Sequence, residues 1–261
     1  MNLKTKERTV GATPAGAGNR DAAAKAVQEM FTSIAPRYDL LNHVLSFNID
    51  RLWWWRTARR FDAIQQRPGA QVLDLCCGTG DMALALRRRA GSAEARILGA
   101  DFSHAMLQRA AAKGSTASGK ETGLARSLHW IEADALRLPF PNGHFDLVTS
   151  AFGFRNLADY DAGLREIARV LRPGGQCGIL DFGEPSGLIG QMYRIYFKKV
   201  LPKIGTLISG VHGPYAYLPA SVERFPAPEE MVERMQLAGF RESSWTPYTF
   251  GVAGLYVGVK A

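Results

Sequence analysis

The chain is poor in cysteine and has no long hydrophobic segment. Two of its three cysteines, Cys76 and Cys77, are adjacent, and no CxxC or Cys/His ligand set occurs. This pattern excludes a disulfide framework, and we expect a reduced cytoplasmic protein without a metal site. No stretch approaches the roughly 18 apolar residues that a membrane-spanning helix needs. Residues 1–24 lack the apolar core of a secretory signal, and we expect them to form a disordered tail.

The excess of positive charge is moderate and selects no partner by itself. The formal net charge is +8, from 32 Lys and Arg against 24 Asp and Glu. Such a charge permits nucleic acid, an anionic membrane surface or an acidic ligand. No basic stripe alternates with aromatic residues, so we expect no nucleic-acid partner. The local cluster Arg87, Arg88 and Arg89 is typical of a solvated helix face.

The N-terminal part is predicted to be helical. Apolar residues recur at helical spacing over residues 22–34, which predicts an amphipathic helix that Pro36 ends. A second helix is predicted over residues 51–64 with Asp50 as its N-cap. It contains Trp53, Trp54 and Trp55, and three consecutive tryptophans cannot all face one core. At least one of them is therefore expected at a surface, a groove or a partner.

From residue 71 onward, short apolar runs alternate with helical patterns. Predicted strands cover residues 71–76, 96–101, 128–133, 145–150 and 177–182, with helices at 81–90, 103–113 and 159–171 and a polar loop at 114–123. Such alternation predicts a doubly wound parallel sheet. A helix at 228–237 precedes strand-like runs at 241–249 and 252–260, which predict a closing antiparallel pair. We therefore predict an α/β fold with a mostly parallel, seven-stranded sheet.

We predict one domain over residues 25–261, with a helical cap at 25–69 and an inserted helical segment at 186–226. The insertion mixes aromatic and basic side chains (Tyr193, Arg194, Tyr196, Phe197, Lys198 and Lys199). A helix packed on the core with a basic outer face would explain this mixture. The alternatives are a lid over an apolar substrate, or a patch that rests on a bilayer.

Acidic residues follow three neighbouring predicted strands. Asp74 precedes a turn with Gly78 and Gly80, where glycine lets the backbone approach a ligand closely. Asp101 ends the second strand, where an acid can accept hydrogen bonds from a ribose diol, and Asp134 could accept from an exocyclic amine. Each acid alone is more simply a loop or capping residue. Together, at one edge of a parallel sheet, they predict a nucleoside site.

The turn indicates which nucleoside binds. It does not fit the G-x-G-x-x-G pattern of dinucleotide sites, and Asp81 stands where a pyrophosphate would need a helix N-terminus free of negative charge. A ligand with an amino-acid part tolerates Asp81, because the positively charged ammonium group of the ligand is attracted to the carboxylate. The turn therefore favours S-adenosylmethionine over NAD, and an NAD-dependent oxidoreductase is the rival hypothesis.

These acids and the closing antiparallel pair resemble class I S-adenosylmethionine-dependent methyltransferases, which have a Rossmann-like fold. From about Ala26 to the C-terminus, the chain resembles the ubiquinone/menaquinone biosynthesis C-methyltransferases. The motifs are MFTSIAPRYDLLN at 30–42, LSF at 45–47, FGFRN at 152–156, LPKIG at 201–205, YAYLPASV at 215–222 and FP at 225–226. They lie outside the general cofactor-binding core, so the resemblance is specific.

The resemblance implies methylation of a ring carbon of a polyprenylated quinol. The Cys76-Cys77 pair favours demethylmenaquinol, with 2-polyprenyl-6-methoxy-1,4-benzoquinol of ubiquinone biosynthesis as the alternative. A non-catalytic partner that binds S-adenosylmethionine is a third hypothesis, and a nucleic-acid methylase is disfavoured by the FGFRN motif. The family's cofactor-binding positions correspond to Thr79, Asp101, Asp134 and Ala135. Ala151 stands where the family often has serine.

The same resemblance points to Arg155, Asn156 and Tyr38 as catalytic residues. A quinol carbon becomes a good nucleophile when a hydroxyl loses its proton, and a free phenol has a pKa of about 10. Arg155 would stabilise the phenolate or orient a water, Asn156 would bind a ring oxygen, and Tyr38 would close the site. The alternative for Arg155 is a structural ion pair with Asp159 or Asp161. His43 and His212 could be bases, but we leave them outside the site.

The substrate that the resemblance implies also suggests a location. A polyprenyl chain needs an apolar trench and a route from the bilayer. Aromatic residues beside Arg and Lys, such as Trp53, Trp54 and Trp55, fit a shallow surface that contacts a membrane. We therefore expect a cytoplasmic protein that associates peripherally with the inner face of the cell membrane. The sequence is compatible with a homodimer and leaves the oligomeric state open.

Overall fold

A seven-stranded sheet forms the centre of the molecule, in the strand order β3-β2-β1-β4-β5-β7-β6. The computed structural model describes residues 10–14, 16–90, 95–118, 128–185, 187, 190, 196 and 214–261. The strands are β1 Gln71–Leu75, β2 Arg96–Asp101, β3 Leu128–Glu132, β4 Phe145–Ala151, β5 Leu171–Phe182, β6 Phe240–Tyr248 and β7 Ala253–Lys260. The main helices are α1 Arg20–Ile34, α2 Tyr38–Leu45, α3 Ile49–Arg60, α4 Asp62–Gln65, α5 Asp81–Ala90, α6 His104–Ser118, α7 Tyr160–Val170, α10 Pro214–Arg224 and α11 Pro228–Leu237.

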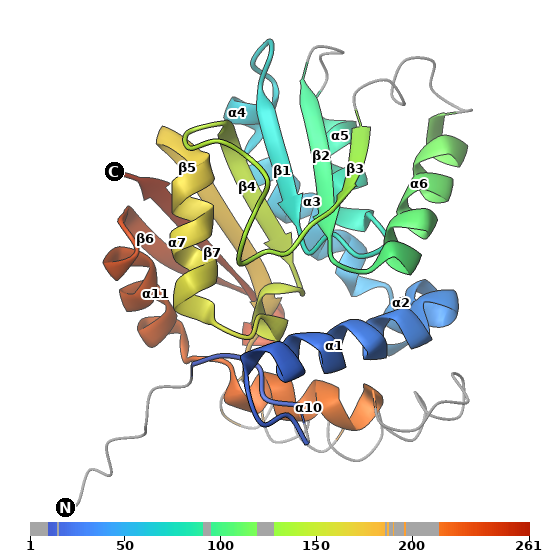
Figure 1. Cartoon of the computed structure of the whole chain (residues 1–261). Coiled ribbons are helices and arrows are strands. Elements are labelled where there is room, and N and C mark those ends of the chain that lie inside the picture. Colours follow the sequence, from blue (N-terminus) through green and yellow to red (C-terminus); the bar gives the residue numbers. More distant parts are fainter. Residues whose placement is uncertain are drawn as a thin grey trace, which may run out of the picture.

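The strand directions confirm the predicted topology. Strands β1 to β5 pair in parallel, whereas β7 runs antiparallel to β5 and β6 runs antiparallel to β7. Helices cover both faces of the sheet (Figure 1), so both sides of the central strands are buried. In β4, for example, every residue from Phe145 to Ser150 is buried.

Two hydrophobic cores lie on the two faces of the sheet. In one core, Leu164 of α7 and Met235 of α11 pack against strand residues such as Leu73. In the other, Trp53 of α3 and Leu86 of α5 pack against residues such as Val72. The parallel strands point toward the end of the sheet where α1, α2 and α10 lie (Figure 1). Ligands of open parallel sheets bind at this carboxyl end.

The N-terminal segment differs from the predicted disordered tail over residues 1–24. Within the described residues, Ala12 N–H donates to the Leu157 carbonyl at 2.8 Å, and Tyr160 N–H donates to the Val10 carbonyl at 2.9 Å. Helix α1 begins at Arg20, because the Asn19 side chain accepts a hydrogen bond from Ala22 N–H at 2.8 Å and caps it. The chain is therefore ordered well before the predicted boundary, and residues 1–9 lie outside the described residues.

In the N-terminal helices, the start of α3 differs from the prediction and the end of α1 agrees with it. Asp50 is not the N-cap of α3: the helix starts at Ile49 with Asn48 at the cap position, and Asp50 is buried in the first turn. The prediction that Pro36 ends the first helix is confirmed, since α1 ends at Ile34 and a short 3-10 helix, Ala35–Arg37, leads into α2. The tryptophans divide as expected, because Trp53 is buried, Trp54 half-buried and Trp55 exposed.

Several predictions fall on residues that are not described. In the predicted loop at 114–123, α6 continues to Ser118, and residues 119–123 lie outside the described part. In the predicted helical insertion at 186–226, the structure describes α10, whose bounds Pro214–Arg224 the sequence pattern did not locate. The described residues do not include His212 or the LPKIG motif. Of the mixed aromatic and basic side chains of the insertion, they include Tyr196 alone. No described helix is both long and apolar enough to cross a membrane.

Candidate active site

A pocket opens at the carboxyl ends of β1, β2 and β4, beneath the N-terminal helices. It holds about 1020 Å³ of space free of protein atoms, including its open mouth. Eight predicted site residues line it: Tyr38, Asp74, Gly78, Thr79, Asp101, Asp134, Ala135 and Asn156. Two predicted residues, Gly80 and Arg155, are not among the lining residues. The topology therefore gathers residues from distant parts of the chain into one cavity.

The turn after β1 exposes its backbone to this pocket. Gly78 has φ +54°, and a Cβ built there would meet only the Tyr38 ring at 3.9 Å. A ligand can therefore approach the backbone closely at this glycine. Gly80 is required for a different reason. Its φ is +86°, and a Cβ would lie 2.5 Å from the Trp130 ring, so it allows packing behind the turn.

Asp101 joins the turn to the end of β2. Its Oδ2 accepts a hydrogen bond from Gly78 N–H at 2.8 Å, and its Oδ1 accepts from Ser103 N–H at 2.9 Å. A carboxylate has about four lone-pair sites, so each oxygen can still accept one more hydrogen bond, as a ribose diol would supply. Burial raises the pKa of Asp101 to about 6, although the backbone amides of Ser103 and Gly78 lower it. The ionised form therefore predominates at neutral pH.

Asp74 lies beneath the same turn and is fully buried. The Thr149 hydroxyl donates to its Oδ1 at 2.9 Å. Burial raises the pKa of Asp74 to about 7, while the Thr149 hydroxyl and the Ala83 amide lower it. Asp134 completes the acidic side of the pocket, and its Oδ1 accepts from Leu136 N–H at 2.9 Å. Asp74 and Asp101, whose pKa values are both raised, lie in one cleft with Asp134, and these carboxyl groups suit a ligand that brings hydroxyl donors and a positive charge.

A charged network that the sequence did not reveal ties α2 to the turn. Lys113 of α6 lies 2.9 Å from Asp39 Oδ2 and 2.9 Å from Asp81 Oδ1, and it donates to Thr79 Oγ1 at 3.1 Å. The Thr79 hydroxyl in turn donates to Asp39. These residues come from α2, the turn, α5 and α6, so no local sequence signal connects them. Through this network, Thr79 anchors the helical cap over the pocket.

Arg155 lies behind the pocket wall. Its Nη1 is 3.0 Å from Asp181 Oδ1 on β5 and also donates to the Phe152 carbonyl, while its Nε lies 3.4 Å from Ser221 Oγ. The ion pair is therefore formed with Asp181 rather than with the predicted alternatives. Asp159 caps α7 and pairs with Arg20, and Asp161 pairs with Arg234. Direct contact between Arg155 and a ligand has no support in this arrangement.

Asn156 connects Arg155 to the pocket. Its Nδ2 lies 3.5 Å from the Phe152 carbonyl that also accepts from Arg155, and its Oδ1 accepts from the Tyr217 hydroxyl at 3.2 Å. The short helix Phe154–Asn156 is further fixed by the Tyr160 hydroxyl, which donates to the Arg155 carbonyl at 3.0 Å. Asn156 is therefore held at the pocket wall by partners from the turn before it and from α10.

Tyr38 and a set of apolar side chains form the rest of the wall. Burial raises the pKa of Tyr38, so its hydroxyl is protonated at neutral pH and can donate a hydrogen bond. Beside it, the pocket has an apolar wall, as the proposed substrate requires, formed by residues that we did not assign to the site from the sequence: Phe31, Trp54, Met82, Phe102, Met106 and Phe152. One side of the pocket thus suits a polar, cationic ligand and the other suits an apolar one. Among the described residues, no group of three metal-ligating side chains occurs.

Comparisons with known proteins agree with this architecture. A sequence model described as the ubiE/COQ5 methyltransferase family matches residues 19–260. The demethylmenaquinone methyltransferase of Deinococcus radiodurans is 50% identical over 93% of this chain and 96% of its own length. That of Thermus thermophilus is 50% identical over 88% of this chain and 99% of its own. A ubiquinone/menaquinone biosynthesis C-methyltransferase of Geobacter sulfurreducens is 43% identical over 90% and 88%.

More distant solved structures share the fold. The [4+2]-cyclase SpnF matches with a TM-score of 0.65 at 18% identity, over 96% of this chain and 98% of its own. A methyltransferase of Thermotoga maritima, described as a possible histamine N-methyltransferase, matches with a TM-score of 0.61 at 17% identity, over 90% and 100%. At such identities the likeness concerns the fold alone.

Proposed function

The chain belongs to the ubiE/COQ5 methyltransferase family, and on that premise we propose that it methylates a ring carbon of demethylmenaquinol, with S-adenosylmethionine as the methyl donor. The match to the family model confirms the family that the sequence motifs indicated. The observation that carries the choice of substrate is the 50% identity, over almost the whole chain, to two demethylmenaquinone methyltransferases.

The acidic side of the pocket fits the cofactor. Asp101 would accept the ribose hydroxyls, Asp134 would accept from the adenine amine, and Gly78 would let the amino-acid part lie against the backbone. The negative charge of Asp74 and Asp101 attracts the cationic ligand, and Ala135 adds a small apolar surface beside the adenine. When bound, S-adenosylmethionine supplies an electrophilic methyl group that needs little further activation.

The opposite side would hold the quinol. The Tyr38 hydroxyl and the Asn156 amide can donate hydrogen bonds to a ring oxygen and stabilise the phenolate after its proton leaves. Trp54 and Phe152 exclude water from the ring and hold it in a defined orientation. Arg155 acts indirectly, because it fixes the Phe152 carbonyl and this carbonyl in turn positions Asn156. This positioning role replaces the direct contact with the phenolate that we predicted for Arg155.

The polyprenyl tail of such a substrate resides in a bilayer. We infer that the protein works in peripheral contact with the inner face of the cell membrane, where the quinol can enter the pocket without crossing water. The support is the apolar character of the substrate and of one pocket wall.

Incubation with methyl-labelled S-adenosylmethionine tests the assignment. Demethylmenaquinol and the methoxybenzoquinol of ubiquinone biosynthesis are supplied separately, and mass spectrometry locates the label. We expect the label on a ring carbon, with the naphthoquinol preferred at least about tenfold, because a pocket distinguishes ligands that differ in ring size. Preference for the benzoquinol would place the enzyme in ubiquinone synthesis. Binding of the cofactor without methylation of either quinol would indicate the non-catalytic alternative.

A further inference from the structure

Exposed apolar side chains gather around α3. Among the described residues, the large hydrophobic side chains that are exposed are Val10, Phe47, Leu52, Trp55, Leu237 and Phe250. Leu52 and Trp55 lie on one side of α3, Phe47 precedes the helix by two residues, and Phe250 belongs to the connection between β6 and β7. Apolar side chains that gather on one surface, rather than lying singly, mark an interaction site.

Two contacts hold the connection between β6 and β7 against α3. Trp53 Nε1 donates to Thr249 Oγ1 at 2.8 Å, and the Arg56 guanidinium lies 4.3 Å from the centre of the Tyr248 ring. Phe250 directly follows Thr249 in the chain, so this residue lies close to α3. Phe47, Leu52, Trp55 and Phe250, with the exposed arginines of α3, are called the α3 face below.

The two phenylalanines of the α3 face adopt backbone conformations that a folded chain rarely gives to this residue. Phe47 has φ 53° and is 78% exposed, and Phe250 has φ 57° and is 77% exposed. A positive φ is unfavourable for a bulky side chain. Within the described structure both rings remain mostly exposed, although the centre of the Phe47 ring lies 5.9 Å from that of Tyr196. An external apolar environment would provide the burial that offsets this cost.

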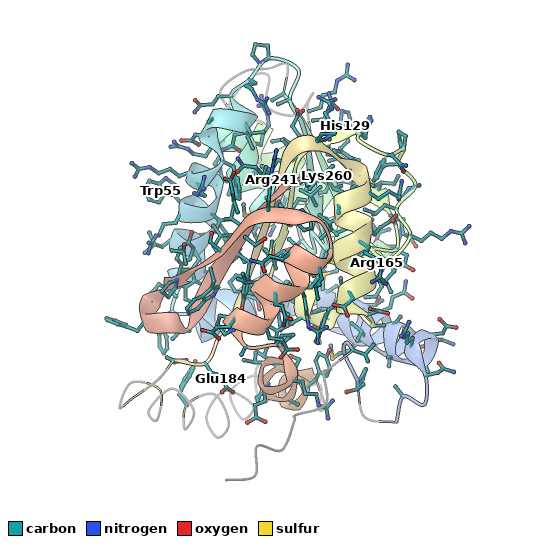
Figure 2. The ribbon with its side chains drawn as sticks, turned by 90° about the vertical axis from the view of Figure 1, so that its left-hand side faces the viewer. Trp55, His129, Arg165, Glu184, Arg241 and Lys260 are labelled. Carbon is teal, nitrogen blue, oxygen red and sulfur yellow. The ribbon has the colours of Figure 1, made fainter. Side chains whose placement is uncertain are left out.

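The charge of α3 complements an anionic surface. Its exposed charged residues are Arg51, Arg56, Arg59 and Arg60, and its one acid, Asp50, is buried and accepts from His43. The Arg59 guanidinium lies 5.2 Å from the centre of the Trp55 ring. Arginines beside exposed aromatic rings suit the boundary between headgroups and acyl chains. Figure 2 shows Trp55 at the outer edge of the molecule.

The α3 face adjoins the pocket. Trp54, between Trp53 and Trp55, lines the cavity. The Trp53 ring lies 5.7 Å from the ring of Phe152, which also lines it. One helix therefore presents its inner side to the pocket and its outer side to the surroundings.

We propose that the α3 face docks on an anionic membrane surface, with Phe47, Leu52, Trp55 and Phe250 among the headgroups and the arginines of α3 on the lipid phosphates. Such docking would place the pocket beside the bilayer that holds the quinol tail, a consequence that rests on the proposed function. A second copy is the less suitable occupant. A two-fold interface brings the same patch together from both chains, so arginines would face arginines.

Vesicle co-sedimentation tests the docking surface. Phosphatidylglycerol-containing vesicles are compared with phosphatidylcholine vesicles at low and high salt. We expect wild-type binding to the anionic vesicles to fall steeply with salt, because exposed charges are screened. Leu52→Ser combined with Phe250→Ser should weaken vesicle binding at least about tenfold, since two apolar side chains would no longer insert among the lipid headgroups. Arg51→Gln combined with Arg59→Gln should remove most of the salt dependence.

Matched controls lie elsewhere on the surface. Leu237 on α11 is 70% exposed, and Arg165 is an exposed arginine on α7 (Figure 2). Leu237→Ser and Arg165→Gln should bind vesicles as the wild type does. Equal binding by the α3-face variants, or no wild-type binding to anionic vesicles, would overturn the proposal. The proposal would also be overturned if the wild type formed a dimer without lipid and the α3-face variants were monomers, because the face would then serve self-association.

A second readout separates this proposal from the proposed function. All variants are assayed with a quinol that lacks the prenyl tail and dissolves in water. We expect wild-type turnover from every α3-face variant, because none of the changed residues lines the pocket. If the wild-type enzyme bound vesicles but methylated no quinol, the result would contradict the proposed function and leave the docking proposal intact. Loss of turnover on the soluble quinol in these variants would contradict a docking role.

Discussion

Replacement of Asp101 by asparagine is expected to weaken the binding of S-adenosylhomocysteine by about 100-fold or more. The carboxylate accepts from Gly78 and Ser103 and has lone pairs left for a ribose diol. Asparagine has one acceptor oxygen, so its amide would face one of these N–H groups and lose the charge as well. Hydrogen bonds to charged groups contribute about 1.5–3 kcal/mol each, and 100-fold corresponds to about 3 kcal/mol. Isothermal calorimetry measures the effect.

The pH dependence of binding provides a second readout for Asp101. Burial raises the pKa of Asp101 to about 6, so the carboxylate is lost as the pH falls through this value. Wild-type affinity should therefore fall about tenfold from near pH 7.5 to near pH 5, because roughly nine in ten carboxyls are then protonated. Asp74, whose buried carboxyl has a pKa of about 7, also titrates in this range. The difference between the wild-type and Asp101→Asn curves isolates the contribution of Asp101.

A control excludes unfolding as the cause. The pKa of Asp101 is higher in the folded protein than its ordinary value of 3.8. The folded state therefore binds this proton more tightly, and stability is lost as the pH rises from about 4 to about 6. At neutral pH the wild type loses stability because the buried Asp101 is ionised, whereas Asp101→Asn carries no charge at this position. The melting temperature of the variant should therefore not fall greatly. Asp62→Asn, on α4 at the opposite end of the sheet (Figure 1), should bind normally. Unchanged affinity in Asp101→Asn would contradict the assigned role.

The second large effect concerns the buried pair of Arg155 and Asp181. Burial raises the pKa of Asp181, and the neighbouring Arg155 lowers it. Arg155→Met alone leaves the buried carboxyl without its partner, which costs about 3–5 kcal/mol and is expected to lower the melting temperature strongly. Arg155→Met combined with Asp181→Asn removes both charges, and this paired variant should fold well enough for kinetic analysis.

The paired variant separates positioning from stability. We expect its affinity for S-adenosylhomocysteine to match the wild type, whereas kcat falls about 100-fold or more. The reason is that the Phe152 carbonyl and Asn156 lose the guanidinium that fixes them, and small displacements of a positioned group cost about this much. Arg234→Met serves as the control, because it removes an equally buried arginine on α11 that pairs with Asp161 and Glu230. Full turnover in the paired variant would show that Arg155 is only structural.

Much of the sheet could be predicted from the sequence, because its central strands are buried on both faces. The predicted starts of β1, β2, β3 and β4 agree with the structure. Strand β5 is the exception, since it begins at Leu171 rather than at Cys177. Pro173, Gly174 and Gly175 resemble a turn, but here they form an irregularity at which the register with β4 shifts. A bulge that keeps a strand continuous has the same residues as a turn that ends it.

The acidic side of the site was predictable for a topological reason. Parallel strands end at one edge, so Asp74, Asp101 and Asp134 had to lie near one another once the strands were identified. The partners of Arg155 were not predictable. Asp181 and Ser221 come from β5 and from α10, whose position within the insertion the pattern did not locate, and nothing local in the sequence connects them to Arg155.

The exposure of Phe47 and Phe250 was also not predictable. Both residues sit in turns with positive φ, where sequence patterns lead one to expect glycine or asparagine. A phenylalanine between two helices or two strands is ordinarily predicted to be buried. Only the three-dimensional arrangement brings the connection between β6 and β7, which contains Phe250, against α3.

A crystal structure of the protein with S-adenosylhomocysteine would show whether this pocket holds the cofactor. We predict ribose hydroxyls on the Asp101 carboxylate, the adenine amine beside Asp134, and the sulfur directed toward the apolar wall near Tyr38 and Asn156. A nucleoside bound elsewhere at saturating ligand, or a sulfur that faces away from this wall, would contradict this prediction.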